Sequence, residues 1–174
     1  MKRTIAIVAG GDSSELVVSL RSAQGLYSFI DKERYNLYIV EMEGHRWEVV
    51  LPDGSKTPID RNDFSFMENG EKKHFDFAYI TIHGTPGENG ILQGYFDLLG
   101  IPYSSCNVLV SAMTFNKFTC NQYLKGFGIR VAESLILRKG FEITDEEVEA
   151  ATYARGSQDM PDRDVVADLK AATD

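Results

Sequence analysis

The sequence predicts an α/β protein built on an open, mostly parallel β-sheet with helices on both faces. Apolar runs rich in β-forming residues alternate along the chain with segments whose apolar residues recur at helical spacing. The first run, "TIAIVA" (residues 4–9), is apolar almost throughout, as expected of a strand covered on both faces. Strands that alternate with helices form parallel sheets, because each helix crosses back over the sheet to the next strand.

The strand at 4–9 is followed by "GGDSSE", which supplies a tight turn and helix-capping residues. Ser13 or Ser14 is the expected cap. From residue 17 to residue 30 the apolar residues recur every three or four positions, which predicts an amphipathic helix. These elements form the first strand–helix unit of the sheet.

The second strand is predicted at residues 35–42, "YNLYIVEM". In the stretch that follows, Asp53 and Gly54 mark a hairpin turn between two further extended segments. The third principal strand is predicted at residues 75–84, "FDFAYITIHG". With the strand at 4–9 these strands complete the predicted sheet.

A helix is predicted at residues 91–100, with Gly100 as its C-terminal cap. Residues 101–105, "IPYSS", form a short strand, and residues 107–128 are helical up to Gly128. Residues 129–140 are extended and begin a new element.

Length and composition describe one domain with a real hydrophobic core. The chain has 174 residues, of which 43% are hydrophobic, and its mean hydropathy is -0.22; both values are typical of globular proteins. No apolar run approaches the roughly 20 residues that span a bilayer, so no membrane partner is expected. The two cysteines, Cys106 and Cys120, have neither metal-ligand nor disulfide spacing. We expect a cytoplasmic protein.

Charge is distributed unevenly along the chain. Residues 141–174 hold ten acidic and three basic residues, a net charge of -7, whereas the whole chain carries -8. The remaining -1 makes residues 1–140 nearly neutral. Nucleic-acid binding requires a basic surface, which neither part provides, so no nucleic-acid partner is expected. Residues 1–140 are predicted to form the folded domain, and residues 141–174 an acidic tail that is partly helical or disordered.

The third predicted strand ends in a histidine, His83, that is followed by the glycine-rich stretch "GTPGENG". Open α/β sheets bind ligands at the carboxyl ends of their strands, and both this loop and "GGDSSE" fall there. Glycines let the main chain approach a ligand closely. Asn89 and Glu88 have a simpler explanation as capping residues of the following helix, but capping does not explain His83. The spacing G-x-G-x-x-G is absent, so no nicotinamide or flavin cofactor is indicated.

"HGTPGENGILQG" resembles the N-terminal signature of D-alanine–D-alanine ligases, and it matches the family pattern at every fixed position. "VAGGDSSELVVSLRSA" resembles the first loop and helix of the same family, and "GIPYSSCNVLVSAMTFNKFTCNQYLKGFGI" resembles its next segment. The order and spacing of the three blocks agree with the family over about residues 3–139. The resemblance implies a Rossmann-like (pre-ATP-grasp) N-terminal domain.

What the resemblance implies is an ATP-dependent ligase. Such enzymes activate the carboxylate of one D-alanine as an acyl phosphate, which the amine of a second D-alanine attacks to give a dipeptide precursor of peptidoglycan. The complete enzyme uses ATP and Mg²⁺ (or Mn²⁺), and members commonly form homodimers through this domain. Partners implied are therefore D-alanine, ATP and a second copy of the chain.

The resemblance also implies roles for individual residues. His83, Glu15 and Ser19 match substrate-binding positions, and Lys117 matches a lysine that reaches the ATP phosphates. The loop that supports the site comprises Gly84, Gly87, Glu88, Asn89 and Gly90. Two departures stand out: Val17 occupies the place of an acid in the first loop, and Asn116 replaces the acid before the lysine. No metal ligand is predicted in this chain.

After Gly140 the ATP-binding strand, the lid and the metal ligands of the family are not found. The chain is therefore expected to be inactive alone and to bind no cofactor by itself. An expressed fragment, a frame-shifted product and a natural short protein all fit this pattern. The competing hypothesis is a non-catalytic ligand-binding or dimerisation module derived from the ligase. A receiver domain is disfavoured, because His83 stands where such a domain needs an aspartate.

Overall fold

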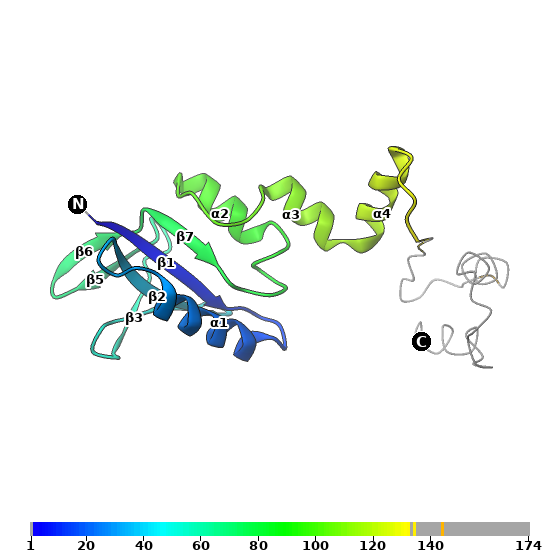
Figure 1. The fold of residues 1–174 in the computed structure, drawn as a ribbon. Coiled ribbons are helices and arrows are strands. Elements are labelled where there is room, and N and C mark those ends of the chain that lie inside the picture. The colour runs from blue at the N-terminus through cyan, green and yellow to red at the C-terminus, as the bar shows by residue number, and fades with distance from the viewer. Residues whose placement is uncertain (1, 133, 135–143, 145–174) are drawn as a thin grey trace. The chain divides into compact units, whose positions relative to one another are not determined.

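The computed structural model describes residues 2–132, 134 and 144, and the chain divides into two compact units, Met1–Phe115 and Asn116–Asp174. Figure 1 shows the elements of both units, and each unit is described by itself. The elements of the first unit are β1 (Arg3–Gly10), α1 (Leu16–Phe29), β2 (Tyr35–Glu43), β3 (Arg46–Val50), β4 (Lys56–Pro58), β5 (Ser65–Glu68), β6 (Glu71–His74), β7 (Phe77–Ile80), α2 (Ile91–Leu99) and α3 (Val108–Phe115). The second unit contains α4 (Lys117–Gly126).

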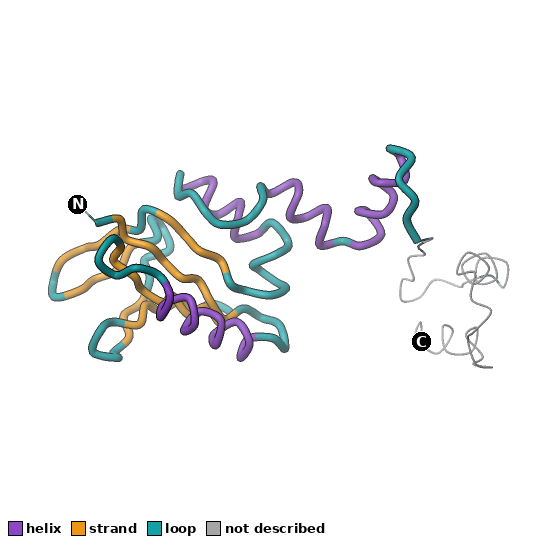
Figure 2. Tube along the Cα trace, viewed as in Figure 1, coloured by secondary structure: helices purple, strands orange, loops and turns teal. Residues whose placement is uncertain are grey.

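The main sheet has the strand order β4-β3-β2-β1-β7, in which β1 lies between β2 and β7. β1 is parallel to both β2 and β7, whereas β3 and β4 extend the sheet as an antiparallel hairpin. Figure 2 shows these strands crossing the first unit side by side. The predicted α/β fold with its open sheet is confirmed. Because β1, β2 and β7 run in the same direction, their carboxyl ends lie at one edge of the sheet.

The two faces of β1 contact different cores, as the alternation of side chains along a strand requires. Ile7 and Ala9 pack against Ala23 of α1 on one face. Ala6 and Val8 belong to a larger cluster on the other face, which α2 and the β5–β6 hairpin cover. Four phenylalanines dominate that cluster: Phe64, Phe66, Phe75 and Phe96. Helices therefore cover both faces, as predicted.

A buried polar contact joins β2 to the β5–β6 hairpin. The Tyr38 hydroxyl donates a hydrogen bond to Glu68 Oε2 at 2.9 Å, and the same carboxylate forms an ion pair with Lys73. Burial raises the pKa of Tyr38, and the neighbouring Glu68 carboxylate raises it further. A buried carboxylate needs such partners, because desolvation without them is costly.

The β5–β6 hairpin was not predicted from the sequence, although the residues of its turn are typical of a hairpin. Asn69 and Gly70 connect the two strands with φ angles of 52° and 81°. Asn-Gly is the residue pair that a two-residue hairpin turn with positive φ angles favours. The hairpin places Phe66 in the large core, so it completes the second face of the sheet.

Three predicted elements are shorter or differently divided in the structure. β7 ends at Ile80, so the predicted strand at 75–84 is too long, and the strand at 101–105 is reduced to a single bridge between Tyr103 and Ala78. The helix predicted at 107–128 is two helices, because Asn116 adopts extended backbone and its side chain caps α4 by accepting from Thr119 N.

The predicted N-terminal caps are also wrong in detail. α1 begins after Glu15 with no side-chain cap, and Ser13 instead accepts a hydrogen bond from Glu15 N at 3.2 Å. α2 begins after Gly90, not Asn89, although Asn89 Oδ1 accepts from Ile91 N. Gly100 ends α2 with a φ of 68°, as predicted. The acidic tail and most of residues 129–140 lie outside the described residues.

The two-faced core gives a direct test of the fold. Phe96 is 0% exposed, whereas Phe29 at the end of α1 is 87% exposed. Phe96→Ala is expected to lower the free energy of unfolding by about 3–5 kcal/mol, because it removes buried area and leaves a cavity. Phe29→Ala is expected to change it by less than about 0.5 kcal/mol. Urea unfolding followed by circular dichroism measures both, and equal losses would contradict the assignment of the core.

Candidate functional site

The loop after β1 and the loop after β7 meet at the carboxyl edge of the sheet. The Ser13 hydroxyl donates to the carbonyl oxygen of His83 at 2.9 Å, and Asp12 N donates to Thr85 O at 3.0 Å. These bonds join segments about 70 residues apart in the sequence. The structure therefore brings together the two loops that the sequence placed at this edge.

Glycines at the start of the first loop are required by close contacts. Gly10 and Gly11 have φ angles of +103° and +99°, which L-residues with side chains rarely adopt. A Cβ atom on Gly10 would lie 2.1 Å from Met42 O, and one on Gly11 would lie 2.5 Å from Ile82 Cγ2. The loop can turn toward the His83 segment only because these side chains are absent.

Glu88 and Asn89 close the second loop on itself. Glu88 Oε2 accepts from Gly84 N at 2.7 Å, and Gly84 O accepts from Glu88 N at 2.8 Å. Asn89 Nδ2 donates to Thr85 Oγ1 at 3.1 Å. The two side chains that the sequence interpretation assigned to helix capping therefore shape the loop after His83. The peptide bond between Thr85 and Pro86 is cis.

Gln93 of α2 anchors the same loop through hydrogen bonds, and it was not among the predicted site residues. Its side chain is fully buried, and Nε2 donates to Gly87 O at 2.6 Å and to Ser105 Oγ at 2.8 Å. Gln93 Oε1 is buried with no hydrogen-bond partner among the described residues. The sequence feature that could have identified Gln93 is its amide on the apolar side of the helix predicted at 91–100, because a buried amide needs hydrogen-bond partners.

The His83 side chain is exposed, and no described residue makes a hydrogen bond to its ring. It lies three residues beyond the end of β7. Its backbone carbonyl accepts a hydrogen bond from Ser13, which holds the main chain at the sheet edge, while the two ring nitrogens remain free for a ligand. Glu15 is likewise exposed, at the start of α1.

Ser19 lies in the interior. It is 0% exposed, and its hydroxyl donates to Thr81 O at 2.9 Å and accepts from Gly10 N at 3.0 Å. Both contacts are to the protein, so its predicted contact with a substrate stays a prediction, and its geometry is that of a residue that supports the site. Val17 is 63% exposed on the same helix.

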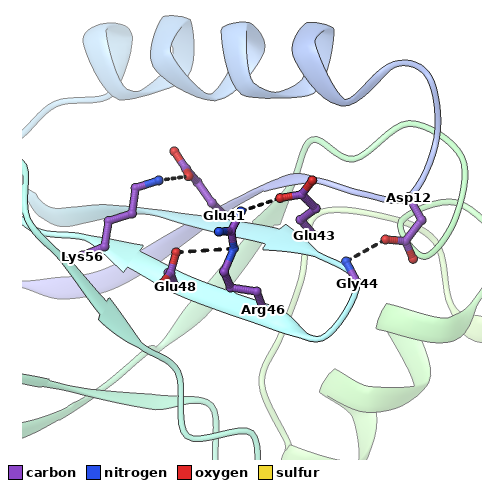
Figure 3. A network of polar contacts seen from close by, with 7 residues as sticks. All are labelled: Asp12, Glu41, Glu43, Gly44, Arg46, Glu48 and Lys56. Carbon is purple, nitrogen blue, oxygen red and sulfur yellow. Dashed lines mark hydrogen bonds and ion pairs between the residues drawn. The ribbon is translucent and has the colours of Figure 1, made fainter.

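A network of charged residues lies beside the first loop, on the face of the sheet that α1 covers in part (Figure 3). Asp12 Oδ1 accepts from Gly44 N at 2.9 Å, which ties the first loop to the turn between β2 and β3. Arg46 pairs with Glu43 and Glu48, and Lys56 pairs with Glu41. A pocket of about 40 Å³ lies among these side chains and the start of α1. Its three carboxylates are paired with cations, and none of the predicted site residues lines it.

Lys117 belongs to the second unit, where it is the first residue of α4 and is exposed. Its predicted contact with ATP stays a prediction. In the part of the chain that the structure describes, no group of three or more histidine, cysteine, aspartate or glutamate side chains is arranged to hold a metal ion. None of the helices described there has the length and apolar composition of a membrane span.

Comparison with known proteins identifies the family. Residues 4–106 match a sequence model described as D-ala D-ala ligase N-terminus. The chain belongs to the D-alanine–D-alanine ligase family. It is 99% identical over 148 residues to a D-alanine–D-alanine ligase of Phocaeicola vulgatus and 74% identical over the same length to one of Bacteroides fragilis. These matches cover 85% of this chain and 46% of each relative.

Solved structures of ligases of the same family also match the fold of this chain. D-alanyl-alanine synthetase A from Vibrio cholerae matches with a TM-score of 0.72 at 31% identity, over 89% of this chain and 45% of that one. The D-alanine–D-alanine ligase from Coxiella burnetii matches with a TM-score of 0.79 at 25% identity, over 98% of this chain and 57% of that one. The chain spans about half the length of the curated relatives it matches. Residues 129–174 also match a second model, described as dehydratase large subunit.

The close packing of the second loop gives a testable consequence. A Cβ atom on Gly87 would lie 2.4 Å from Ile82 O, whereas one on Gly25 of α1 would meet nothing within 4 Å. Gly87→Ala is expected to lower the free energy of unfolding by about 1–3 kcal/mol through overpacking. Gly25→Ala is expected to raise it by about 0.5–1 kcal/mol through helix propensity. Urea unfolding of the two variants checks this, and a neutral Gly87→Ala variant would contradict the loop geometry.

Proposed function

We propose that this chain supplies the D-alanine-binding half of a D-alanine–D-alanine ligase. The observation that carries the proposal is the exposed His83 ring at the meeting point of the two loops, in a chain that belongs to the ligase family. The imidazole has no protein partner among the described residues, so both nitrogens are available to a small polar ligand. The carboxylate of D-alanine is the group we assign to it.

Glu15 is the second group assigned to the substrate. Its carboxylate is exposed at the start of α1, next to the loop in which Ser13 Oγ and Asp12 N donate hydrogen bonds to the His83 segment. A carboxylate in that place complements an ammonium group, and an imidazole complements a carboxylate. An amino acid presents both groups on one carbon atom, which fits a site with one acidic and one imidazole side chain at the same sheet edge.

ATP and Mg²⁺ belong to the complete ligase under this proposal. The described residues supply no cluster of metal ligands, so they do not fit a resident Mg²⁺ ion. Lys117 is the residue we assign to the ATP phosphates, as an exposed point charge at the start of α4. The chain spans 46% of its relatives, and we assign phosphoryl transfer to the part of the ligase that these residues do not match. A cytoplasmic location and a homodimer formed through the first unit complete the proposal.

Substitution of His83 in a full-length ligase with this N-terminal half tests the proposed role. His83→Ala is expected to lower kcat/KM for D-alanine by about 10²- to 10³-fold, because a group that orients the substrate is removed. His74→Ala provides the matched control, since His74 is also exposed but ends β6 in the small two-stranded sheet. A coupled assay of ADP release measures both variants. Equal activity in the two variants would remove His83 from the site.

The second candidate function is a non-catalytic ligand-binding or dimerisation module. The observation that favours it is Val17, which is 63% exposed on α1 at the position where the resemblance places a substrate-binding acid. Both candidates keep the sheet and the two loops. They differ in whether this chain works together with an ATP-binding half.

The isolated chain is expected to release no phosphate from ATP in the presence of D-alanine and Mg²⁺. The physical reason is that its described residues hold no cluster of ligands for the Mg²⁺ ions that offset the charge of a transferring phosphoryl group. A malachite-green phosphate assay measures this, with the full-length Phocaeicola vulgatus ligase as the positive control. Phosphate release dependent on D-alanine at a rate comparable to that control would contradict the expectation.

A further inference from the structure

Thr81 directs the chain as it leaves the sheet. β7 ends at Ile80, yet Thr81 N still donates to Val8 O at 2.8 Å, and the Thr81 hydroxyl donates to the same carbonyl oxygen at 2.9 Å. One residue therefore bonds to β1 twice at the point where strand pairing stops. His83 follows two residues later, so the direction of this exit determines where the His83 segment starts.

Ser19 meets Thr81 from the opposite side. Its hydroxyl donates to Thr81 O at 2.9 Å, accepts from Gly10 N at 3.0 Å, and lies 3.3 Å from Thr81 Oγ1. One buried hydroxyl from α1 thus forms hydrogen bonds with the backbone N–H of the last residue of β1 and with the carbonyl oxygen of the first residue after β7. Without it, the Gly10 N–H and the Thr81 carbonyl would lose partners in a place that excludes water, unless the loops moved.

We propose that Ser19 and Thr81 are positioning residues of the ligase site, and that their three-way contact with Gly10 fixes the His83 ring relative to the first loop. The inference rests on the proposed function, in which His83 contacts D-alanine. Both site loops start at this contact: Gly10 leads into the Asp12–Ser13 segment, and Thr81 leads to His83. The contact between the loops, Asp12 N to Thr85 O and Ser13 Oγ to His83 O, forms only if both start in the right direction.

Two other buried hydroxyl groups show why this contact is distinctive. Ser65 is also 0% exposed, but its hydroxyl donates to Asp63 two residues away. Ser111 bonds to Cys106 O, five residues away. Those contacts are local, whereas Ser19 joins three segments separated by 9 and 62 residues. Ser65 is therefore a matched control for the loss of a buried serine hydroxyl.

The activity test uses the full-length Phocaeicola vulgatus ligase, with residues numbered as in this chain. Thr81→Val and Ser19→Ala are expected to lower kcat/KM for D-alanine by about 10- to 100-fold, mainly through a raised KM. Thr81→Ser keeps the hydroxyl and should restore most of the activity, and Ser65→Ala should leave kcat/KM unchanged. In the His83→Ala background the Thr81→Val effect should disappear, because the two residues act through one group.

A second measurement does not depend on activity. In this chain, hydrogen exchange of the Asp12 amide reports the contact between the loops, and Thr81→Val should speed that exchange about tenfold or more relative to Ser65→Ala. Unchanged Asp12 exchange, or a Thr81→Val loss that persists in full without His83, would overturn the inference. An inactive wild-type ligase, or a fully active His83→Ala variant, would instead overturn the proposed function and leave the exchange result to decide the positioning role.

Discussion

Parallel pairing of β1 with both of its neighbours is the constraint on which the site depends. Ile7 pairs with Ile39 of β2 and with Tyr79 of β7, so the three strands run in register and in the same direction. Their carboxyl ends then reach one edge, and the loops that leave them must share a small space. The positive φ angles of Gly10 and Gly11 and the buried Ser19 hydroxyl are consequences of that crowding.

Ion pairs near the carboxyl edge of the sheet stabilise the two loops less than the number of these pairs suggests. Arg46 and Glu43 have largely solvated side chains, and those of Lys56 and Glu41 are partly exposed; pairs near the surface are typically worth about 0–1 kcal/mol. Hydrogen bonds to backbone groups restrict the loops more, because each specifies the position of a main-chain atom. Glu88 shows the difference: its carboxylate holds Gly84 N and so shapes the loop after His83.

The strand and helix positions of the first unit could be predicted from sequence because they follow apolar periodicity. β1, β2 and α2 carry it clearly, and the structure places them within one or two residues of the prediction. The break at Asn116 could not be predicted this way, because an asparagine side chain competes locally with the helix while the apolar pattern continues. The motif located His83, but the roles of Ser19 and Thr81 depend on contacts between residues 62 apart, and periodicity carries no information about such contacts.

The exposure of the proposed D-alanine site has a physical consequence for how the proposed ligase is divided. The first helix presents Val17 and Val18, 63% and 52% exposed, close in sequence to Glu15. Exposed apolar side chains next to polar groups that bind a substrate are typical of a surface that another domain covers. The His83 side chain is exposed to water, and an acyl phosphate needs exclusion of water to survive until an amine attacks it. Under the proposed function, this chain orients D-alanine, whereas protection of the activated carboxylate also requires the ATP-binding part of the ligase.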